Sequence, residues 1–267
     1  MRVRDLSVHF RVRRRRFRTE SITAVSGVNL DIPRGETYGL VGESGCGKTS
    51  LARAVLRLIP VTQGQVLFDG TDIMAMREQP LRMLRRRMQV VFQDQYGCLP
   101  PRKTVSQIVG EALAIHTEAA RDQRLHAVAN TLDQVGLGRR YMNRLASQLS
   151  GGERQRVSIA RAIVLAPEFV ICDEPVSALD ALLQVQIVNL LLRLKKELRL
   201  TLLFISHDLA LVRHLADRVA VMHRGQIVED NRTDQIFSNP QNSHTRALLA
   251  HARARWATAM TRRGNLE

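Results

Sequence analysis

The chain has few aromatic residues, few cysteines and no long hydrophobic run. Aromatic residues make up 4% of the 267 residues, so few rings are available on which the bases of a single-stranded nucleic acid could stack. The three cysteines, Cys46, Cys98 and Cys172, are far apart, which favours reduced thiols over a disulfide framework or a zinc site. No run approaches the roughly 18 apolar residues of a membrane-spanning helix, and no signal-peptide pattern opens the sequence. We therefore expect a soluble chain that is not exported.

Arginine, in contrast, is abundant. The formal net charge is +15, and six of the residues from Arg11 to Arg18 are arginine, with a second cluster between Arg82 and Arg87. Such clusters bind nucleic acid, face an anionic membrane or are simply solvated. Because aromatic residues are scarce, we favour a solvated loop or a membrane-facing surface for the segment 11–18.

Short apolar runs alternate with helical patterns along the chain. The runs that predict strands lie at 38–41, 64–68, 88–92, 168–172 and 201–205, and helical spacing occurs at 107–116, 122–135 and 182–198. This alternation predicts an α/β fold with a mostly parallel sheet. Strands expected at 4–10 and 22–32, on either side of the arginine-rich segment, predict an N-terminal antiparallel β region. The mainly helical stretch 94–166 predicts a helical insertion.

The most informative motif is Gly-x-x-x-x-Gly-Lys-Thr at residues 42–49. It follows the apolar run 38–41 and opens a helical pattern, so it is a loop between a strand and a helix. Its glycines allow backbone N–H groups to turn toward phosphates, Lys48 adds a positive charge, and Thr49 offers a hydroxyl to Mg²⁺. The motif predicts a nucleoside triphosphatase. The expected nucleotide contacts are Gly42, Glu43, Ser44, Gly45, Cys46, Gly47, Lys48, Thr49 and Ser50.

A pair of carboxylates ends the apolar run 168–172. Asp173 and Glu174 would then lie at the carboxyl edge of the sheet, where α/β nucleotidases place their charged groups. We expect Asp173 to hold Mg²⁺ through water. Glu174 would act on the attacking water, either as a general base or as the group that orients it.

A second motif built for an anion is Leu-Ser-Gly-Gly-Glu at residues 149–153. A Ser-Gly-Gly turn that opens a helix presents N–H groups, a hydroxyl and the positive end of the helix dipole. The chain already has one phosphate loop. Ser150, Gly151 and Gly152 are therefore expected to contact the nucleotide of a partner subunit.

Together these motifs resemble those of the ATP-binding subunits of ABC transporters. Residues 42–49 resemble the Walker A motif of that family, 169–174 the Walker B motif, and 149–153 the signature. Ser177-Ala178-Leu179-Asp180 is similar to the D-loop, Gln93 to the Q-loop glutamine and His207 to the switch histidine. The motifs stand in the family's order and cover about residues 1–230.

The resemblance implies a role for several further residues. Gln93 would contact Mg²⁺ and sense the γ-phosphate, His207 would hydrogen-bond that phosphate, and Asp180 would lie at the nucleotide. Phe10 would stack on adenine, with an ordinary core phenylalanine as the alternative. The catalytic set is then Glu174, His207 and Gln93, and the metal-binding set is Thr49, Gln93 and Asp173.

The resemblance also implies an architecture and a set of partners. An ABC ATPase core is expected over residues 1–240, with a helical subdomain at about 94–166 and a C-terminal extension at 241–267. ATP and Mg²⁺ are the expected cofactors. The expected partners are a second ABC ATPase subunit, a copy or a different chain, two transmembrane permease subunits and, indirectly, an extracytoplasmic solute-binding protein. The chain would then work at the cytoplasmic face of the inner membrane.

Within that family the chain resembles the importers of oligopeptides, dipeptides and nickel. This resemblance rests on the insert before the phosphate loop, on 91–94 followed by 99–102, and on Thr-Arg-Ala-Leu-Leu at 245–249. The chain departs from that pattern at Gln95 and Pro100, and Asn242-Ser243-His244 replaces His-Pro-Tyr. We therefore expect an importer of peptides, with nickel or another small solute as the alternative cargo.

Two other readings compete with an importer. A nucleic-acid-linked ABC ATPase is favoured by the charge of +15, but the long coiled coils, zinc cysteines or tandem cassettes of those proteins are missing, so we expect no nucleic acid. A regulatory subunit without turnover conflicts with Glu174 and His207, which are both present.

Two local expectations complete the sequence interpretation. The segment 95–102 follows Gln93 and is expected to dock a membrane subunit through Tyr96 and Leu99, with a core role as the alternative for Leu99. Cys46 sits in the phosphate loop, where the helix dipole and Lys48 are expected to favour the thiolate. Cys172, in a buried strand, is expected to be the least reactive thiol.

Overall fold

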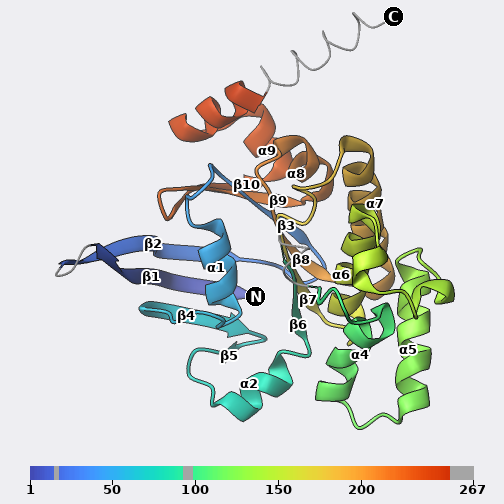
Figure 1. Ribbon diagram of the computed structural model, residues 1–267. Helices are drawn as coiled ribbons and strands as arrows, with labels where there is room; N and C mark the ends of the chain where they lie inside the picture. The colour runs from blue at the N-terminus through green and yellow to red at the C-terminus, as the bar shows by residue number, and fades with distance from the viewer. Residues whose placement is uncertain (15–17, 93–98, 253–267) are drawn as a thin grey trace, which may run out of the picture. The chain divides into compact units, whose positions relative to one another are not determined.

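β-Strands and helices alternate along the chain in the computed structural model, which describes residues 1–14, 18–92 and 99–252 (Figure 1). The chain forms two units. Unit 1 consists of Met1–Ile32, Thr37–Met74 and Ile205–Glu267, and unit 2 of Pro33–Glu36 and Ala75–Phe204. Both units combine strands with helices, so the predicted α/β class is confirmed.

The N-terminal antiparallel region of unit 1 is a four-stranded sheet. Its strands are β1 (Arg2–Arg14), β2 (Arg18–Asp31), β4 (Gln63–Phe68) and β5 (Thr71–Asp72), in the order β2-β1-β4-β5. The inner face of β1 buries Val3, Leu6 and Val8 completely. Asp5 has a φ of 48° and lies where the register with β2 shifts between Val3 and Leu6, so a bulge interrupts the strict alternation.

The arginine-rich segment 11–18 is partly β-strand, whereas a solvated loop was one of the two alternatives expected from the sequence. β1 extends to Arg14, β2 begins at Arg18, and these two residues pair across the antiparallel strands, while residues 15–17 lie outside the described residues. The loop is wrong for residues 11–14 and 18, because antiparallel pairing uses backbone hydrogen bonds, which a run of charged side chains does not prevent.

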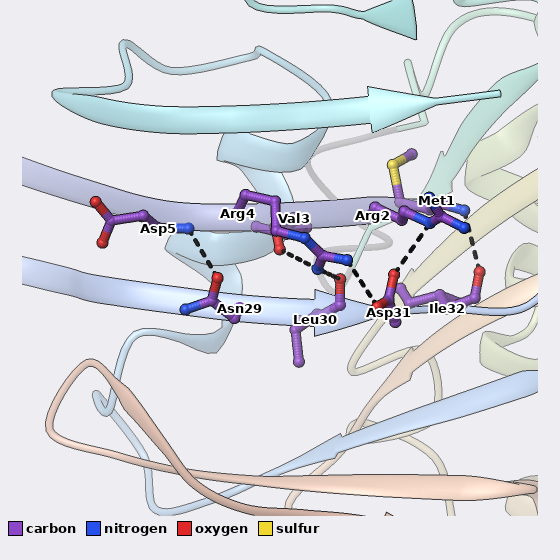
Figure 2. A network of polar contacts seen from close by, with 9 residues as sticks. All are labelled: Met1, Arg2, Val3, Arg4, Asp5, Asn29, Leu30, Asp31 and Ile32. Carbon is purple, nitrogen blue, oxygen red and sulfur yellow. Dashed lines mark hydrogen bonds and ion pairs between the residues drawn. The ribbon is translucent and has the colours of Figure 1, made fainter. Parts of the chain in front are cut away.

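Polar contacts connect the first residues of β1 to the last residues of β2 (Figure 2). Arg4 Nη2 lies 2.8 Å from Asp31 Oδ2, and Arg2 Nε lies 3.4 Å from Asp31 Oδ1. The N-terminal amino group donates to the carbonyl of Ile32 at 3.0 Å, and the Asp5 amide donates to Asn29 Oδ1 at 3.0 Å. These ion pairs are exposed, so we expect them to set register rather than to add much stability.

The rest of unit 1 is a second group of strands with helices. β3 (Thr37–Val41) pairs in parallel with β9 (Arg218–His223), which pairs antiparallel with β10 (Gln226–Arg232). All five residues of β3 are buried, as expected of a strand covered on both faces. The helices of unit 1 are α1 (Lys48–Val55), α8 (Leu209–Leu215), α9 (Thr233–Ser238) and a last helical run over 243–252.

Unit 2 has its own strands. They follow the order β8 (Thr201–Ile205), β7 (Phe169–Asp173) and β6 (Met88–Val91), and β6 pairs in parallel with β7. Every residue of β7 and β8 is buried. The strands predicted at 88–92, 168–172 and 201–205 are thus confirmed, and each predicted end differs from the observed end by at most one residue.

The helices of unit 2 are α2 (Glu78–Leu84), α4 (Val105–His116), α5 (Arg121–Gln134), α6 (Gly151–Ile163) and α7 (Ala181–Leu198). Short 3₁₀ turns, η1 (Arg139–Tyr141) and η2 (Ala146–Gln148), precede α6. Side-chain caps begin three of these helices: Thr104 accepts from the Gln107 amide, Ser150 from Glu153 and Asp180 from Leu183. Ser, Thr and Asp favour this position because they satisfy an N–H that the helix itself leaves open.

Candidate functional site

The phosphate loop joins β3 to α1 inside unit 1. Gly42 has a φ of 155° and Gly47 a φ of 111°. A side chain at Gly42 would collide with the carbonyl oxygen of Met222, and one at Gly47 with that of Ala24. Both glycines are therefore required by packing as well as by backbone conformation.

The neighbouring strands support this loop through backbone hydrogen bonds. Gly225, in the turn between β9 and β10, donates its amide to Cys46 at 2.9 Å and accepts one from Ser26 of β2 at 2.8 Å. α1 begins at Lys48 without a side-chain cap, because Gly47 precedes it. The loop thus lies at an uncapped helix start, a place that favours an anion.

The ammonium group of Lys48 lies over its own loop. Lys48 is 7% exposed, and its Nζ donates to the carbonyl oxygens of Gly42 at 2.8 Å and Glu43 at 2.9 Å. The two carbonyls hold a buried cation in position. The predicted phosphate-binding charge is therefore held at the loop.

Cys46 differs from the sequence expectation. Its side chain is buried, and burial raises its pKa above the ordinary thiol value although the nearby Lys48 acts in the opposite direction. Lys48 Nζ lies 3.8 Å from its Sγ. The thiol form is therefore favoured, because removal from water opposes the thiolate more strongly than the cation supports it.

His207 and Phe10 are also parts of unit 1. His207 follows β8 and precedes α8; its neighbour Ser206 donates its amide to Leu40 of β3 at 3.3 Å, which brings this segment beside the strand that leads into the phosphate loop. His207 is exposed. Phe10 is 37% exposed, so the alternative that it is an ordinary core residue is wrong.

Asp173 and Glu174 lie at the end of β7 in unit 2, as predicted. Asp173 is 3% and Glu174 8% exposed. Glu174 adopts a φ of 48°, a left-handed conformation that is uncommon for residues other than glycine, and it marks the sharp turn out of the strand. Cys172, just before them, is fully buried, and burial raises its pKa to about 12.

The segment after Glu174 is held by a residue that the sequence analysis missed. Gln184 of α7 donates its side-chain amide to the carbonyls of Val176 and Leu179, each at 3.1 Å. Asp180 caps α7 by accepting from the Leu183 amide at 2.9 Å. A glutamine one turn after a cap is common in helices, so no pattern in the sequence pointed to it.

The signature segment opens α6 with a reciprocal cap. Ser150 Oγ accepts from the Glu153 amide at 3.4 Å, and Glu153 Oε2 accepts from the Ser150 amide at 2.8 Å. Gly152 is buried, and a side chain there would touch Leu183 of α7. Gly151 faces Leu179 in the same way, so the signature and the D-loop lie side by side within unit 2.

The predicted residues are thus gathered in two groups. Unit 1 holds the phosphate loop, His207 and Phe10, and unit 2 holds Asp173, Glu174, the D-loop and the signature. Gln93 and Tyr96 lie outside the described residues. Leu99 is 3% exposed, which favours the core role that the sequence left open for it.

A phosphate loop between a buried strand and a helix, with acidic residues at the end of another buried strand, defines a P-loop ATPase. The comparison with known proteins makes this more specific. Residues 25–177 match the ABC transporter family, and the chain belongs to that family. The resemblance read from the six motifs is confirmed.

Two curated relatives cover most of the chain. OppF of Bacillus subtilis, an oligopeptide transport ATP-binding protein, is 45% identical over 232 residues, which are 86% of this chain and 76% of OppF. A Brucella ovis protein whose name refers to peptide import is 46% identical over 248 residues, which are 93% of this chain and 77% of that protein.

Solved structures of ABC cassettes share the fold. The dimeric ABC transporter cassette MJ0796 has a TM-score of 0.77 at 28% identity and covers 87% of this chain and 98% of its own. A post-hydrolysis form of the same cassette, bound to ADP and Pi, is equally similar. Among the residues that our structure describes, no helix has both the length and the hydrophobicity needed to cross a bilayer.

Proposed function

We propose that this chain is the ATP-hydrolysing subunit of an importer that moves peptides across the inner membrane. The subunit works at the cytoplasmic face of that membrane. The observation that carries this proposal is the combination of a built phosphate loop with 45–46% identity, over most of the chain, to proteins named for peptide import. Nickel or another small solute is the alternative cargo.

In the proposed reaction, ATP binds at the phosphate loop. Lys48 exchanges its two carbonyl partners for oxygens of the β- and γ-phosphates, and the N–H groups at the start of α1 face the same anion. Phe10, on the exposed face of β1, supports the adenine ring by stacking. His207 contacts the γ-phosphate.

Mg²⁺ suits the side chains proposed to hold it. Thr49 offers a hydroxyl, Gln93 an amide oxygen and Asp173 a carboxylate, which are the oxygen ligands that this cation prefers. When bound, Mg²⁺ neutralises part of the phosphate charge. Asp173 lies at the end of the buried strand β7, directly before Glu174, and this position at the carboxyl edge of the sheet supports the role.

Glu174 acts on the attacking water. Its carboxylate follows directly after Asp173, and its backbone carbonyl accepts from the amide of Ser177 at 3.3 Å and the hydroxyl of Ser177 at 3.1 Å. This support fixes the turn that carries the side chain. Ser150 and Gly152 face the nucleotide of a second subunit, so the two ATPases close on ATP and reopen after hydrolysis, and their motion reaches two permease subunits.

Uptake in cells tests the function. A strain that lacks this chain is complemented with the wild-type, with Lys48→Ala or with the exposed-lysine control Lys196→Ala, each with the neighbouring membrane subunits. We expect the wild-type and Lys196→Ala to restore uptake of a labelled peptide and Lys48→Ala to abolish it. Uptake of Ni²⁺ but not peptide would identify the alternative cargo. Copurification with nucleic acid in place of membrane subunits would contradict an importer.

A further inference from the structure

Two histidines outside the proposed reaction meet a glutamate of the phosphate loop within unit 1. Glu43 belongs to the phosphate loop, His223 is the last residue of β9, and His244 lies in the helical run 243–252. One donor atom from each of these side chains lies within 4.8 Å of those of the other two. They come from three segments that are far apart in the sequence.

The two imidazole rings are close and have unsatisfied nitrogens. Their centroids are 3.8 Å apart, with the rings tilted by 40°. Nδ1 of His223 and Nε2 of His244 are both buried, and neither has a hydrogen-bond partner among the described residues. A buried polar atom without a partner destabilises the fold, so a pair of them in one place calls for a ligand.

The backbone around His244 is held in place. Glu229 of β10 accepts the amides of Gln241 at 2.8 Å and Asn242 at 3.0 Å. Asn242 Oδ1 in turn accepts the amide of His244 at 2.8 Å. The histidine is therefore presented from a fixed helix start and not from a free chain end, which is the condition for a preorganised site.

We propose that Glu43, His223 and His244 bind one divalent transition-metal ion of the zinc class. Two imidazoles and one carboxylate form a three-ligand zinc set that leaves a fourth position open. Nitrogen ligands favour Zn²⁺, Ni²⁺ or Cu²⁺ over Mg²⁺ and Ca²⁺, which prefer oxygen. Ligand atoms of a tetrahedral site lie about 3.3–3.5 Å apart, so the side chains need to close by at most about 1.5 Å on binding.

The charge around the histidines is mixed, because the carboxylate of Glu43 and the guanidinium of Arg224 both act on His244. Burial, the neighbouring His223 and the positive charge of Arg224 lower the pKa of His244, while Glu43 acts in the opposite direction. A neutral imidazole is the form that binds a metal, and Glu43 contributes one negative charge. His244 also stands where the importer pattern has tyrosine, so this site is not part of that pattern.

Direct metal binding tests the site without reference to transport. The full chain, stripped of metal by a chelator, is titrated with Zn²⁺ against a chromophoric competitor. We expect one ion per chain, unaffected by millimolar Mg²⁺. His223→Gln and His244→Gln should each weaken binding at least tenfold, and Glu43→Gln should also weaken it. The exposed histidine His126 supplies the control, His126→Gln, which should bind like the wild-type.

Two further measurements guard against misfolding and against a thiol site. Zn²⁺ should raise the unfolding temperature of the wild-type by several degrees but not that of His244→Gln, because only a folded site gains from the ion. Cys46→Ser should keep its Zn²⁺ affinity. Equal binding by the wild-type and the His223→Gln/His244→Gln double variant would overturn the proposal, and so would loss of binding in Cys46→Ser.

Discussion

Tyr141 donates its phenolic hydroxyl to Oε1 of Glu153 at 2.6 Å. Glu153 closes the capping box of Ser150, so this bond connects η1 to the first turn of the signature helix. The hydrogen bond from Tyr141, followed by that from the Ser150 amide, lowers the pKa of Glu153, and the same bond raises the pKa of Tyr141. The signature is thus braced by a residue outside the motif.

We expect Tyr141→Phe to destabilise the chain by about 1–2 kcal/mol at pH 7, because it removes a hydrogen bond to a charged group. A folded-state pKa that is lowered adds stability above the unfolded pKa, and this stability is lost as the pH falls through the folded pKa. Urea unfolding of both proteins from pH 7 down to about pH 3 measures the difference, which should shrink below the ordinary carboxyl pKa, because the pKa of folded Glu153 is lowered. An equal difference at every pH would show that Tyr141 acts only through packing.

Glu174→Gln should leave ATP binding intact and slow hydrolysis by about 10²–10⁴-fold, since it removes the group that acts on the attacking water. The amide keeps the size of the side chain, so the turn at φ 48° is retained. Single-turnover hydrolysis by the assembled complex gives the rate. Glu197→Gln, on the exposed surface of α7, is the matched control, and normal turnover by Glu174→Gln would remove Glu174 from the proposed reaction.

Alanine substitutions at Gly45 and Gly47 of the phosphate loop separate two effects: the backbone strain of a positive φ, and a steric clash between the new side chain and its surroundings. Gly45 has a φ of 79° with open space around it, whereas a side chain at Gly47 meets the Ala24 carbonyl. We expect Gly45→Ala to destabilise the chain by about 1 kcal/mol and Gly47→Ala by about 2–5 kcal/mol. Urea unfolding measures both. Similar losses for the two variants would mean that the loop can shift away from β2.

Alkylation should report the raised pKa of Cys46. At pH 7.5 we expect iodoacetamide to modify Cys46 more slowly than glutathione, with a rate that keeps rising at higher pH, because the thiolate is the reactive form. MgATP should slow the reaction further, and Cys172 should react last. Mass spectrometry resolves the sites. If Cys46 reacts faster than glutathione, its pKa is not raised, and the thiolate predicted from the sequence would be correct.

The sequence predicted the elements whose cause is local. Buried runs such as β8 are hydrophobic except for Thr201. The phosphate loop and the Asp173-Glu174 pair are contiguous motifs, so their place in the fold follows from neighbouring residues. α8 was missed although Asp208 caps it, because seven residues are too few for a clear period. The division into residues 1–240 and 241–267 stays a prediction.

The rest depends on contacts between distant segments. Nothing in the sequence indicates that Tyr141 reaches Glu153, that Gln184 holds the D-loop, or that His223 and His244 stack. The predicted thiolate of Cys46 was wrong for the same reason. The local helix start and Lys48 favour the thiolate, but burial in the folded chain raises the pKa more than they lower it.

The two carbonyls that hold the ammonium group of Lys48 affect how much this residue can contribute to nucleotide affinity. Water is already stripped from the ammonium group when the chain folds, because Gly42 and Glu43 accept its hydrogen bonds. In the proposed reaction ATP replaces these carbonyls, so the contribution of Lys48 to ATP affinity is the difference between phosphate and carbonyl acceptors. Lys48 therefore favours highly charged phosphates over weakly charged ligands, because a weakly charged ligand binds the ammonium group no better than the carbonyls that it displaces.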